Sequence, residues 1–170
     1  MKFKGRMWIF ADDDINTDVI FPGKYTYEPL TSEQMAKHAM EDYAPNFAKT
    51  VTTGDVIISG KNFGCGSSRE QAVTCLQTAG VSCIIAKSFA RIYYRNAINQ
   101  ALPLVISPEC VDYIFENKSA FQNETIIVDF DQGIINLQNK EFKFPKLDSQ
   151  ALKIFEAGGL VEFTRELLKK

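Results

Sequence analysis

The residues KNFGCGSSRE, Lys61–Glu70, join an apolar run to a stretch with the spacing of a helix. The apolar run, Val56–Gly60, has the length of a buried strand, and Gln71–Ala79 repeats apolar residues at helical intervals. Two glycines, two serines and an arginine crowd the turn between them. Such a turn is either an ordinary polar connection or a site that holds an anion.

The sequence around this turn predicts a β-α-β crossover. A second strand of the buried type, CIIAKS (Cys83–Ser88), follows the helix, and two strands joined in this way run parallel. A further helix is expected over Ala90–Gln100. It ends before Pro103, after which LVIS predicts another strand.

The rest of the chain adds antiparallel strands and short helices. A first strand is predicted at Met7–Phe10, and TIIVDFDQGIINLQ predicts a β-hairpin that turns at Gly133. KEFKF can add one more strand, and SQALKIFEAGG and LVEFTRELLKK predict short helices separated by Gly158-Gly159. We therefore expect one α/β domain over residues 1–170, with a mixed parallel and antiparallel sheet and flanking helices.

Composition and charge exclude two classes of partner. The chain has 170 residues, of which 45% are hydrophobic, and this is enough to bury a substantial core. Its 19 basic and 21 acidic residues are interspersed, so no basic stripe exists for nucleic acid. No apolar stretch approaches the ~18 residues of a membrane span, and MKFKGRMWIF lacks the apolar core of a signal peptide. We expect a cytoplasmic protein that binds neither nucleic acid nor membrane.

The four cysteines lack the spacing of a metal site. No C-x-x-C pair occurs among them, and a cytoplasmic chain disfavours disulfides. We therefore interpret them as ordinary thiols: Cys65, Cys75, Cys83 and Cys110.

The turn has the residues of an anion site. A helix beginning near Ser67 would present its unpaired amides, and their partial positive charge, to the loop. Gly64 and Gly66 let the backbone approach a ligand without an intervening Cβ. Arg69 can hold a carboxylate through two parallel hydrogen bonds, and a serine hydroxyl in such surroundings loses its proton more readily.

A structural explanation stands beside this one, because serine commonly caps helices. The turn is not a dinucleotide fingerprint, since Arg69 takes the place of the third glycine, and it is not a phosphate loop. A serine hydrolase would need a histidine base. His38, the only histidine, lies in a separate helix capped by Thr31 or Ser32, and no G-x-S-x-G elbow exists. The residues alone leave the anion site and the structural cap open.

Four ordered motifs resemble the small subunits of the aconitase superfamily, the isopropylmalate dehydratases and homoaconitases. GKNFGCGSSREQA is similar to their signature, and DDDINTDVIFPG resembles their N-terminal segment. AKSFARIYYRNAINQALPL resembles their second signature, and EAGGLVEF their C-terminal end. The resemblance is dense from Gly5 to Leu104, thins through the hairpin and returns at the end.

The resemblance implies a swivelling β/β/α domain that closes over the [4Fe-4S] cluster of a separate, larger subunit, in a heterodimer or heterotetramer. In the family, cluster iron binds the hydroxyl and a carboxylate of a small di- or tricarboxylate. This chain is then expected to bind no cofactor or metal and to be inactive alone. Cys65 is expected to be a structural thiol rather than an iron ligand.

The resemblance also assigns roles within the turn. Ser67 corresponds to the base that removes the carbon-bound proton, Arg69 binds a substrate carboxylate, and Ser68 makes a further contact. Asp18 corresponds to an aspartate that faces the cleft and orients Ser67 or Arg69, although a structural turn residue in NTD explains it nearly as well. Arg91 is interpreted as structural, paired within the chain.

The family reads the variable arm of the substrate with a short loop, here KYTYE, so Tyr25, Thr26 and Tyr27 are the expected contacts. Homoaconitases often place an arginine where Tyr27 stands, to pair an additional carboxylate. Glu28 beside it makes a buried carboxylate costly, so a small apolar arm such as that of isopropylmalate fits best. The loop departs from the usual isopropylmalate isomerase pattern, and homocitrate, 2,3-dimethylmalate and citramalate stay possible.

Two hypotheses of other classes remain beside the hydro-lyase subunit of leucine biosynthesis. One is a non-catalytic binding or regulatory module that kept the fold, and the other is a self-sufficient serine enzyme. Intact Ser67 and Arg69 disfavour the first. Activity of the isolated chain would be needed for the second.

Overall fold

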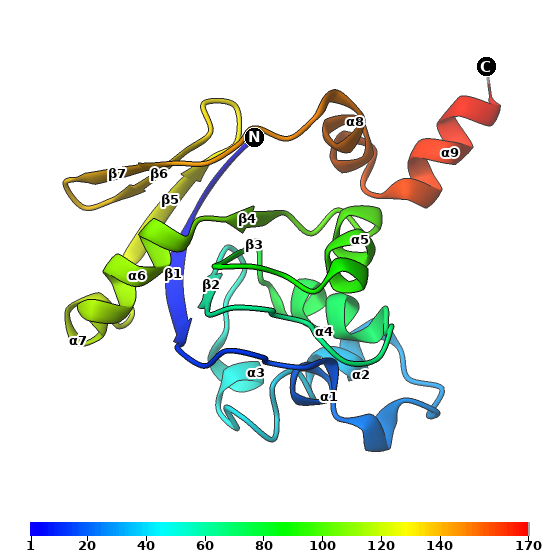
Figure 1. The fold of residues 1–170 in the computed structure, drawn as a ribbon. Helices are drawn as coiled ribbons and strands as arrows, with labels where there is room; N and C mark the ends of the chain where they lie inside the picture. The colour runs from blue at the N-terminus through cyan, green and yellow to red at the C-terminus, as the bar shows by residue number, and fades with distance from the viewer. Residues whose placement is uncertain (170) are drawn as a thin grey trace.

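The chain is described by a computed structural model covering residues 1–169; Lys170, the last residue of the expected domain and of its last helix, lies outside the described residues. A seven-stranded mixed sheet in the order β4-β3-β2-β1-β5-β6-β7 organises it (Figure 1). The strands are β1 (Lys2–Phe10), β2 (Val56–Ser59), β3 (Cys83–Ala86), β4 (Leu104–Ile106), β5 (Thr125–Asp129), β6 (Ile134–Leu137) and β7 (Lys140–Lys143).

The first four strands form the parallel half of the sheet, and the predicted β-α-β crossover is confirmed. β1 pairs with β2, β2 with β3 and β3 with β4, all in parallel. The crossover helices are α4 (Gln71–Ala79) and α5 (Arg91–Asn99). Every residue of β2 and of β3 is buried, because helices cover both faces, and this explains the continuous apolar runs VIIS and CIIA.

The last three strands form the antiparallel half. β5 pairs antiparallel with β1, and β6 and β7 follow in the same manner, so the predicted hairpin and its added strand are confirmed. Here buried and more exposed residues alternate, as expected for strands with one covered face.

Two apolar clusters lie on the two faces of the sheet. Ile57 of β2 and Ile84 of β3 point into the first cluster, and their neighbours Ile58 and Ile85 point into the second. The first is covered by α4, α5, α1 (Thr17–Ile20), α2 (Ser32–Ala36) and α3 (Phe47–Thr50). The second is covered by α6 (Pro108–Glu116) and α7 (Lys118–Phe121).

The C-terminal helices α8 (Ser149–Ala157) and α9 (Leu160–Leu168) extend the chain beyond the sheet, with α9 projecting from the body (Figure 1). Their predicted break is confirmed, since Gly158 ends α8 in the left-handed conformation. Four helices, α1, α3, α6 and α7, were not expected from the sequence. Pro108 resembles a helix breaker after β4, yet it occupies the first turn of α6, where proline is tolerated. Across residues 1–169, no helix has both the length and the apolar character that a bilayer crossing requires.

Candidate active site

The serine–arginine turn leaves the sheet at the carboxyl ends of the parallel strands. Phe10, Ser59 and Ala86 are register partners at the ends of β1, β2 and β3, so the segments that follow them begin side by side. Backbone hydrogen bonds keep them together beyond the strands, from the Asp14 amide to the Lys61 carbonyl (2.9 Å) and across the next pair of segments. This edge of a parallel sheet is where ligands of α/β proteins commonly bind.

Both the backbone conformation and the packing of the turn explain why glycine occupies positions 64 and 66. Both adopt positive φ, 78° at Gly64 and 94° at Gly66, a region that side chains disfavour. A Cβ on Gly64 would lie 2.1 Å from Cγ of the buried Tyr93, so no larger residue fits. The Gly64 amide donates to the Ile15 carbonyl and the Thr17 amide to the Cys65 carbonyl, both at 2.8 Å. The turn is therefore attached to the segment that enters α1.

Ser67 and Ser68 are exposed and lie on the turn itself. The expectation of a helix beginning near Ser67 was wrong, because α4 starts at Gln71 and Glu70 precedes it without a side-chain cap. The structural explanation of Ser67 as a helix cap therefore also fails. The Ser67 carbonyl accepts a hydrogen bond from Thr17 Oγ1 at 3.1 Å, which fixes its backbone to α1.

Asp18 and Arg69 form an ion pair, with Arg69 Nη1 donating to Asp18 Oδ1. The Arg69 side chain is 18% exposed and that of Asp18 is 57% exposed, so the pair lies at the rim of the turn. The capping role in NTD belongs to another residue, since Asn16 Oδ1 accepts from the Val19 amide at 2.9 Å. Asp18 is thus placed to orient Arg69.

Gly23 packs directly against this ion pair, a contact that sequence reasoning missed. A Cβ at Gly23 would lie 2.6 Å from Asp18 Oδ1 and 3.4 Å from Arg69 Nη1. Its φ is outside the left-handed region, so the space beside the pair is the reason for glycine here. The only sequence signal was its position after Pro22 at the end of the N-terminal motif.

The loop expected to read the substrate begins with η1 (Gly23–Tyr25). Tyr27 is 97% exposed, so its ring is open to solvent. Tyr25 is half-buried, and its hydroxyl donates to Glu41 at 3.1 Å. The Thr26 hydroxyl is buried and has no hydrogen-bond partner within residues 1–169. Of the three predicted contacts, Tyr27 alone presents its side chain freely.

Ser68 also lines an open hollow of about 610 Å³ between α2 and α4. Its walls are Ser32, Met35, Ser68, Glu70, Gln71, Thr74 and Asn96. Ser67, Asp18 and Arg69 lie outside these walls. The predicted catalytic residues thus lie outside this hollow, with Ser67 on the exposed turn and the Asp18–Arg69 pair at its rim.

The remaining candidates take other roles. The prediction that His38 lies in a helix was wrong, because the helix capped by Thr31, α2, ends at Ala36. His38 stacks on Tyr25 with ring centroids 3.9 Å apart, and its Nδ1 lies 2.5 Å from Glu41 Oε2, so it is a packing residue. Arg91 is exposed and, within the described part of the chain, forms no ion pair, so the internal partner expected for it is not found.

The cysteines do not form a metal site among the described residues. Cys75, Cys83 and Cys110 are buried, and burial raises the pKa of the Cys110 thiol to about 12. Cys65 is partly exposed, with Sγ 3.4 Å from the Asp14 carbonyl. Within residues 1–169 no three histidine, cysteine or acidic side chains converge as ligands. The cysteines among the described residues therefore offer no ligand set for an iron–sulfur cluster.

A mixed sheet, with a serine–arginine turn at the carboxyl edge of its parallel strands, defines the class of protein to which this chain belongs. The chain belongs to the aconitase C-terminal domain family, whose sequence model matches residues 11–109. It is 48% identical over 166 residues to the 3-isopropylmalate dehydratase small subunit 1 of Methanopyrus kandleri, covering 95% of this chain and 92% of that protein. The 3-isopropylmalate dehydratase small subunit of Aquifex aeolicus is 46% identical over 173 residues, covering 99% and 97%.

Comparison with a solved structure indicates the same family. The crystal structure of 3-isopropylmalate dehydratase from Methanocaldococcus jannaschii superposes with a TM-score of 0.86 at 39% sequence identity, covering 99% of this chain and 98% of that one. The resemblance to small subunits of the isopropylmalate dehydratase type is confirmed, and so is the expected α/β fold with a mixed sheet and flanking helices.

Proposed function

We propose that this chain is the small subunit of a heteromeric iron–sulfur hydro-lyase that interconverts 2-isopropylmalate and 3-isopropylmalate in leucine biosynthesis. The observation that carries the proposal is the exposed Ser67 on the same turn as Arg69, with Asp18 paired to that arginine. Relatives named as small subunits of this enzyme, similar over nearly their whole length, support it.

In the proposed reaction Ser67 is the base and Arg69 the carboxylate clamp. The Ser67 oxygen takes the proton from the substrate carbon. The C–O bond on the neighbouring carbon breaks with its electron pair on the oxygen, and an acid supplied by the partner subunit protonates the leaving hydroxide to water, so an alkene forms. Return of the proton and of water with their positions exchanged gives the other isomer. The cationic Arg69 favours the ionised form of a nearby hydroxyl, and its fork holds the substrate carboxylate in two parallel hydrogen bonds. Ser68 is proposed as a further substrate contact.

The substrate arm is assigned from the loop that carries Tyr27. A tyrosine there, with Glu28 beside it, offers an apolar ring and no cation. A carboxylate buried against this pair would lack a partner, whereas an isopropyl group would not need one. Tyr25 and Thr26 support the loop in this proposal. Homocitrate, 2,3-dimethylmalate and citramalate are the competing substrates.

The partner is proposed to be a large subunit that carries the [4Fe-4S] cluster and completes the site at the serine–arginine turn, in a heterodimer or heterotetramer. We assign no residue of this chain to the cluster. Residues 1–170 are proposed to act as one domain in this complex, and the complex to be cytoplasmic.

The test is to purify this chain, tagged, from a native anaerobic lysate, and to assay the material for dehydration of 2- and 3-isopropylmalate. A brown iron–sulfur partner with alkylmalate turnover is the expected result, while the isolated chain stays inactive. Turnover of tricarboxylates alone would overturn the substrate assignment. Failure of any iron protein to associate, under conditions that preserve clusters, would favour the non-catalytic module of the same fold.

A further inference from the structure

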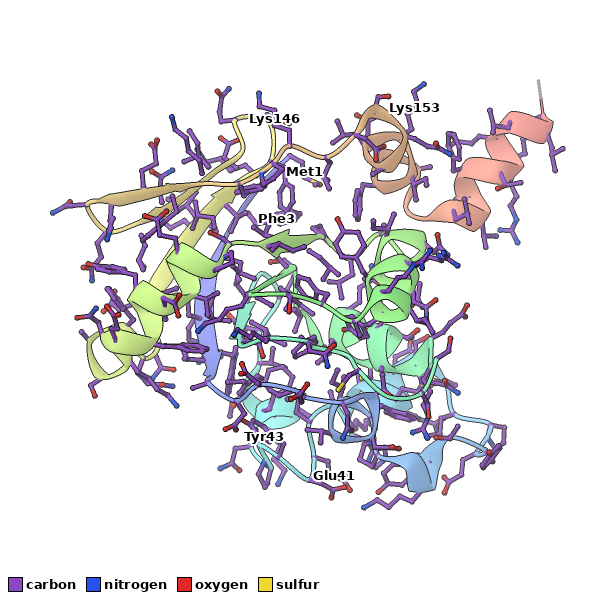
Figure 2. The ribbon with its side chains drawn as sticks, in the orientation of Figure 1. Met1, Phe3, Glu41, Tyr43, Lys146 and Lys153 are labelled. Atoms are coloured by element: carbon purple, nitrogen blue, oxygen red, sulfur yellow. The ribbon has the colours of Figure 1, made fainter. Side chains whose placement is uncertain are left out.

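Three side chains converge on the carboxylate of Glu41, in the segment that follows α2. Lys24 Nζ lies 2.8 Å from Glu41 Oε1, and the Tyr25 hydroxyl donates to the same oxygen at 3.1 Å. His38 Nδ1 lies 2.5 Å from Oε2, and the His38 ring stacks on Tyr25. Figure 2 shows Glu41 at the lower edge of the molecule, below α1. None of these contacts reaches Ser67 or Arg69, so the cluster lies outside the proposed chemistry.

This cluster attaches the loop that carries Tyr27 at one place, and a hydrogen bond to α4 attaches it at another. At its start, Lys24 and Tyr25 are tied to Glu41. In its middle, the Thr26 carbonyl accepts from Gln71 Nε2 at 3.5 Å, at the first residue of α4. The second contact is long and therefore weak. The Glu41 attachment is the stronger of the two.

The segment that carries Glu41 is itself attached to the core of the protein. The Met40 amide donates to the Ile20 carbonyl of α1 at 2.9 Å, and Met40 is completely buried. α1 also carries Asp18, the partner of Arg69. One short helix thus connects the carboxylate clamp to the residue that positions the loop.

We propose that Glu41 is a positioning residue for substrate selection: by binding Lys24, Tyr25 and His38 together, it holds the loop so that Tyr27 meets the variable arm of the substrate. The inference rests on the proposed function. It assigns a role to the only histidine, which completes the stack on Tyr25. Glu41 does not touch the reacting atoms in this arrangement.

The electrostatics of the cluster agree with this geometry. The hydrogen bond from Lys24, opposed by burial and aided by the bonds from His38 and Tyr25, holds the pKa of Glu41 at about 2. The Glu41 carboxylate is therefore ionised near neutral pH. Asp42, the next acid along the chain, lies farther from Lys24 Nζ, at 3.8 Å, and makes none of the other contacts.

The experiment uses the complex with the large subunit and compares Glu41→Ala with Asp42→Ala. KM and kcat are measured for 3-isopropylmalate and for an analogue whose isopropyl group is replaced by methyl. For Glu41→Ala we expect KM for 3-isopropylmalate to rise about tenfold, kcat to stay within about twofold, and the preference over the methyl analogue to fall. Asp42→Ala should resemble the unmodified complex.

A second readout does not depend on turnover. Amide hydrogen exchange of the isolated chain should accelerate at residues 24–28 in Glu41→Ala but not in Asp42→Ala, because only the first variant releases the loop. Glu41→Gln keeps an acceptor for Tyr25 and loses the charge that Lys24 needs, so it should give an intermediate effect. It also replaces Glu41→Ala should that variant fail to fold.

Unchanged exchange at residues 24–28, or an equal loss of kcat/KM for both substrates, would overturn the inference. Failure of the proposed function looks different, since the unmodified complex would then turn over neither alkylmalate. The exchange comparison still decides whether Glu41 holds the loop in that case.

Discussion

Asp18 and Arg69, 51 positions apart in the sequence, meet in an ion pair at the rim of the serine–arginine turn. The pair joins α1, which follows the first strand, to the turn that follows the second. Its arginine is mostly covered and its aspartate mostly exposed. The aspartate therefore holds one edge of the guanidinium, and in the proposed reaction the remaining donors of Arg69 bind the substrate carboxylate.

Replacing Asp18 with asparagine should impair substrate binding more than folding. The amide cannot balance the charge of Arg69, so the guanidinium loses its fixed orientation, and we expect kcat/KM to fall about tenfold. Steady-state kinetics of the complex measure this, with Glu156→Gln on α8 as a control for the loss of an exposed acid. Kinetics equal to those of the control would mean that Asp18 does not orient Arg69.

Replacing Gly23 with alanine should disturb the same pair by contact. The added methyl group would lie 2.6 Å from Asp18 Oδ1, so the carboxylate has to move and kcat/KM should decrease. Gly158→Ala is the contrasting variant, because nothing lies within 4 Å of its Cβ although its φ is 82°. That change should cost about 1 kcal/mol of stability and leave kinetics unaltered. Thermal unfolding and kinetics of both variants separate the two effects.

Ser67→Ala and Ser68→Ala should differ in kind. Loss of the proposed base should lower kcat about 10³-fold while substrate still binds, since general-base catalysis contributes on this scale. Loss of Ser68 removes a substrate contact and should chiefly raise KM. Exchange of the substrate C–H proton with deuterium oxide, followed by NMR, gives a direct measure of proton removal. Exchange that persists in Ser67→Ala would assign the base elsewhere.

Tyr27→Arg should change the choice of substrate without changing stability. Tyr27 is 97% exposed, so little packing is lost, and the new guanidinium can pair a carboxylate on the substrate arm. We expect activity toward isopropylmalate to fall about tenfold and activity toward a tricarboxylate of the homocitrate type to increase. An unaltered ratio of the two kcat/KM values would show that this loop does not contact the variable arm of the substrate.

Asp55 should control acid stability. It is 2% exposed and accepts hydrogen bonds from Arg6 and Trp8, each at 2.8 Å, and from the Thr52 amide. Burial alone would raise the pKa of Asp55, but these bonds outweigh it and leave that pKa lowered. The ionised Asp55 carboxylate therefore stabilises the fold fully above about pH 4, the pKa of an aspartate in an unfolded chain. This stabilisation is lost as the pH falls through the lower pKa of Asp55 in the folded protein.

Asp55→Ala should lower the free energy of unfolding by about 3 kcal/mol at pH 7, because the partners of the carboxylate remain partly buried and unpaired. Urea unfolding at pH 7 and at pH 3 measures this difference, which should shrink at the lower pH. The control is Asp112→Asn, whose ion pair with Lys87 is at the surface, and which should change stability by less than about 1 kcal/mol. Equal effects of the two variants would contradict the prediction.

The parallel pair formed by β2 and β3, the hairpin and the membership of the family could be predicted from the sequence alone. Apolar runs such as VIIS indicate buried strands, and the motif GKNFGCGSSREQA is contiguous. Both can therefore be recognised from the sequence, without knowledge of the tertiary structure. The sequence also singled out Ser67, Arg69 and Asp18. It misplaced the start of α4, because Ser67 and Ser68 look like caps while the helix begins at Gln71.

Which of these residues contact one another is seen only in the folded chain. Asp18 pairs with Arg69, Gly23 packs against both, and Glu41 gathers Lys24, Tyr25 and His38. The Glu41 contacts lie within the single connection between β1 and β2 and depend on how that connection folds. The contact between Asp18 and Arg69 joins segments 51 positions apart, and no local pattern encodes it. It arises because parallel strands bring their carboxyl ends to one edge of the sheet, so the loops that follow must pack on one another.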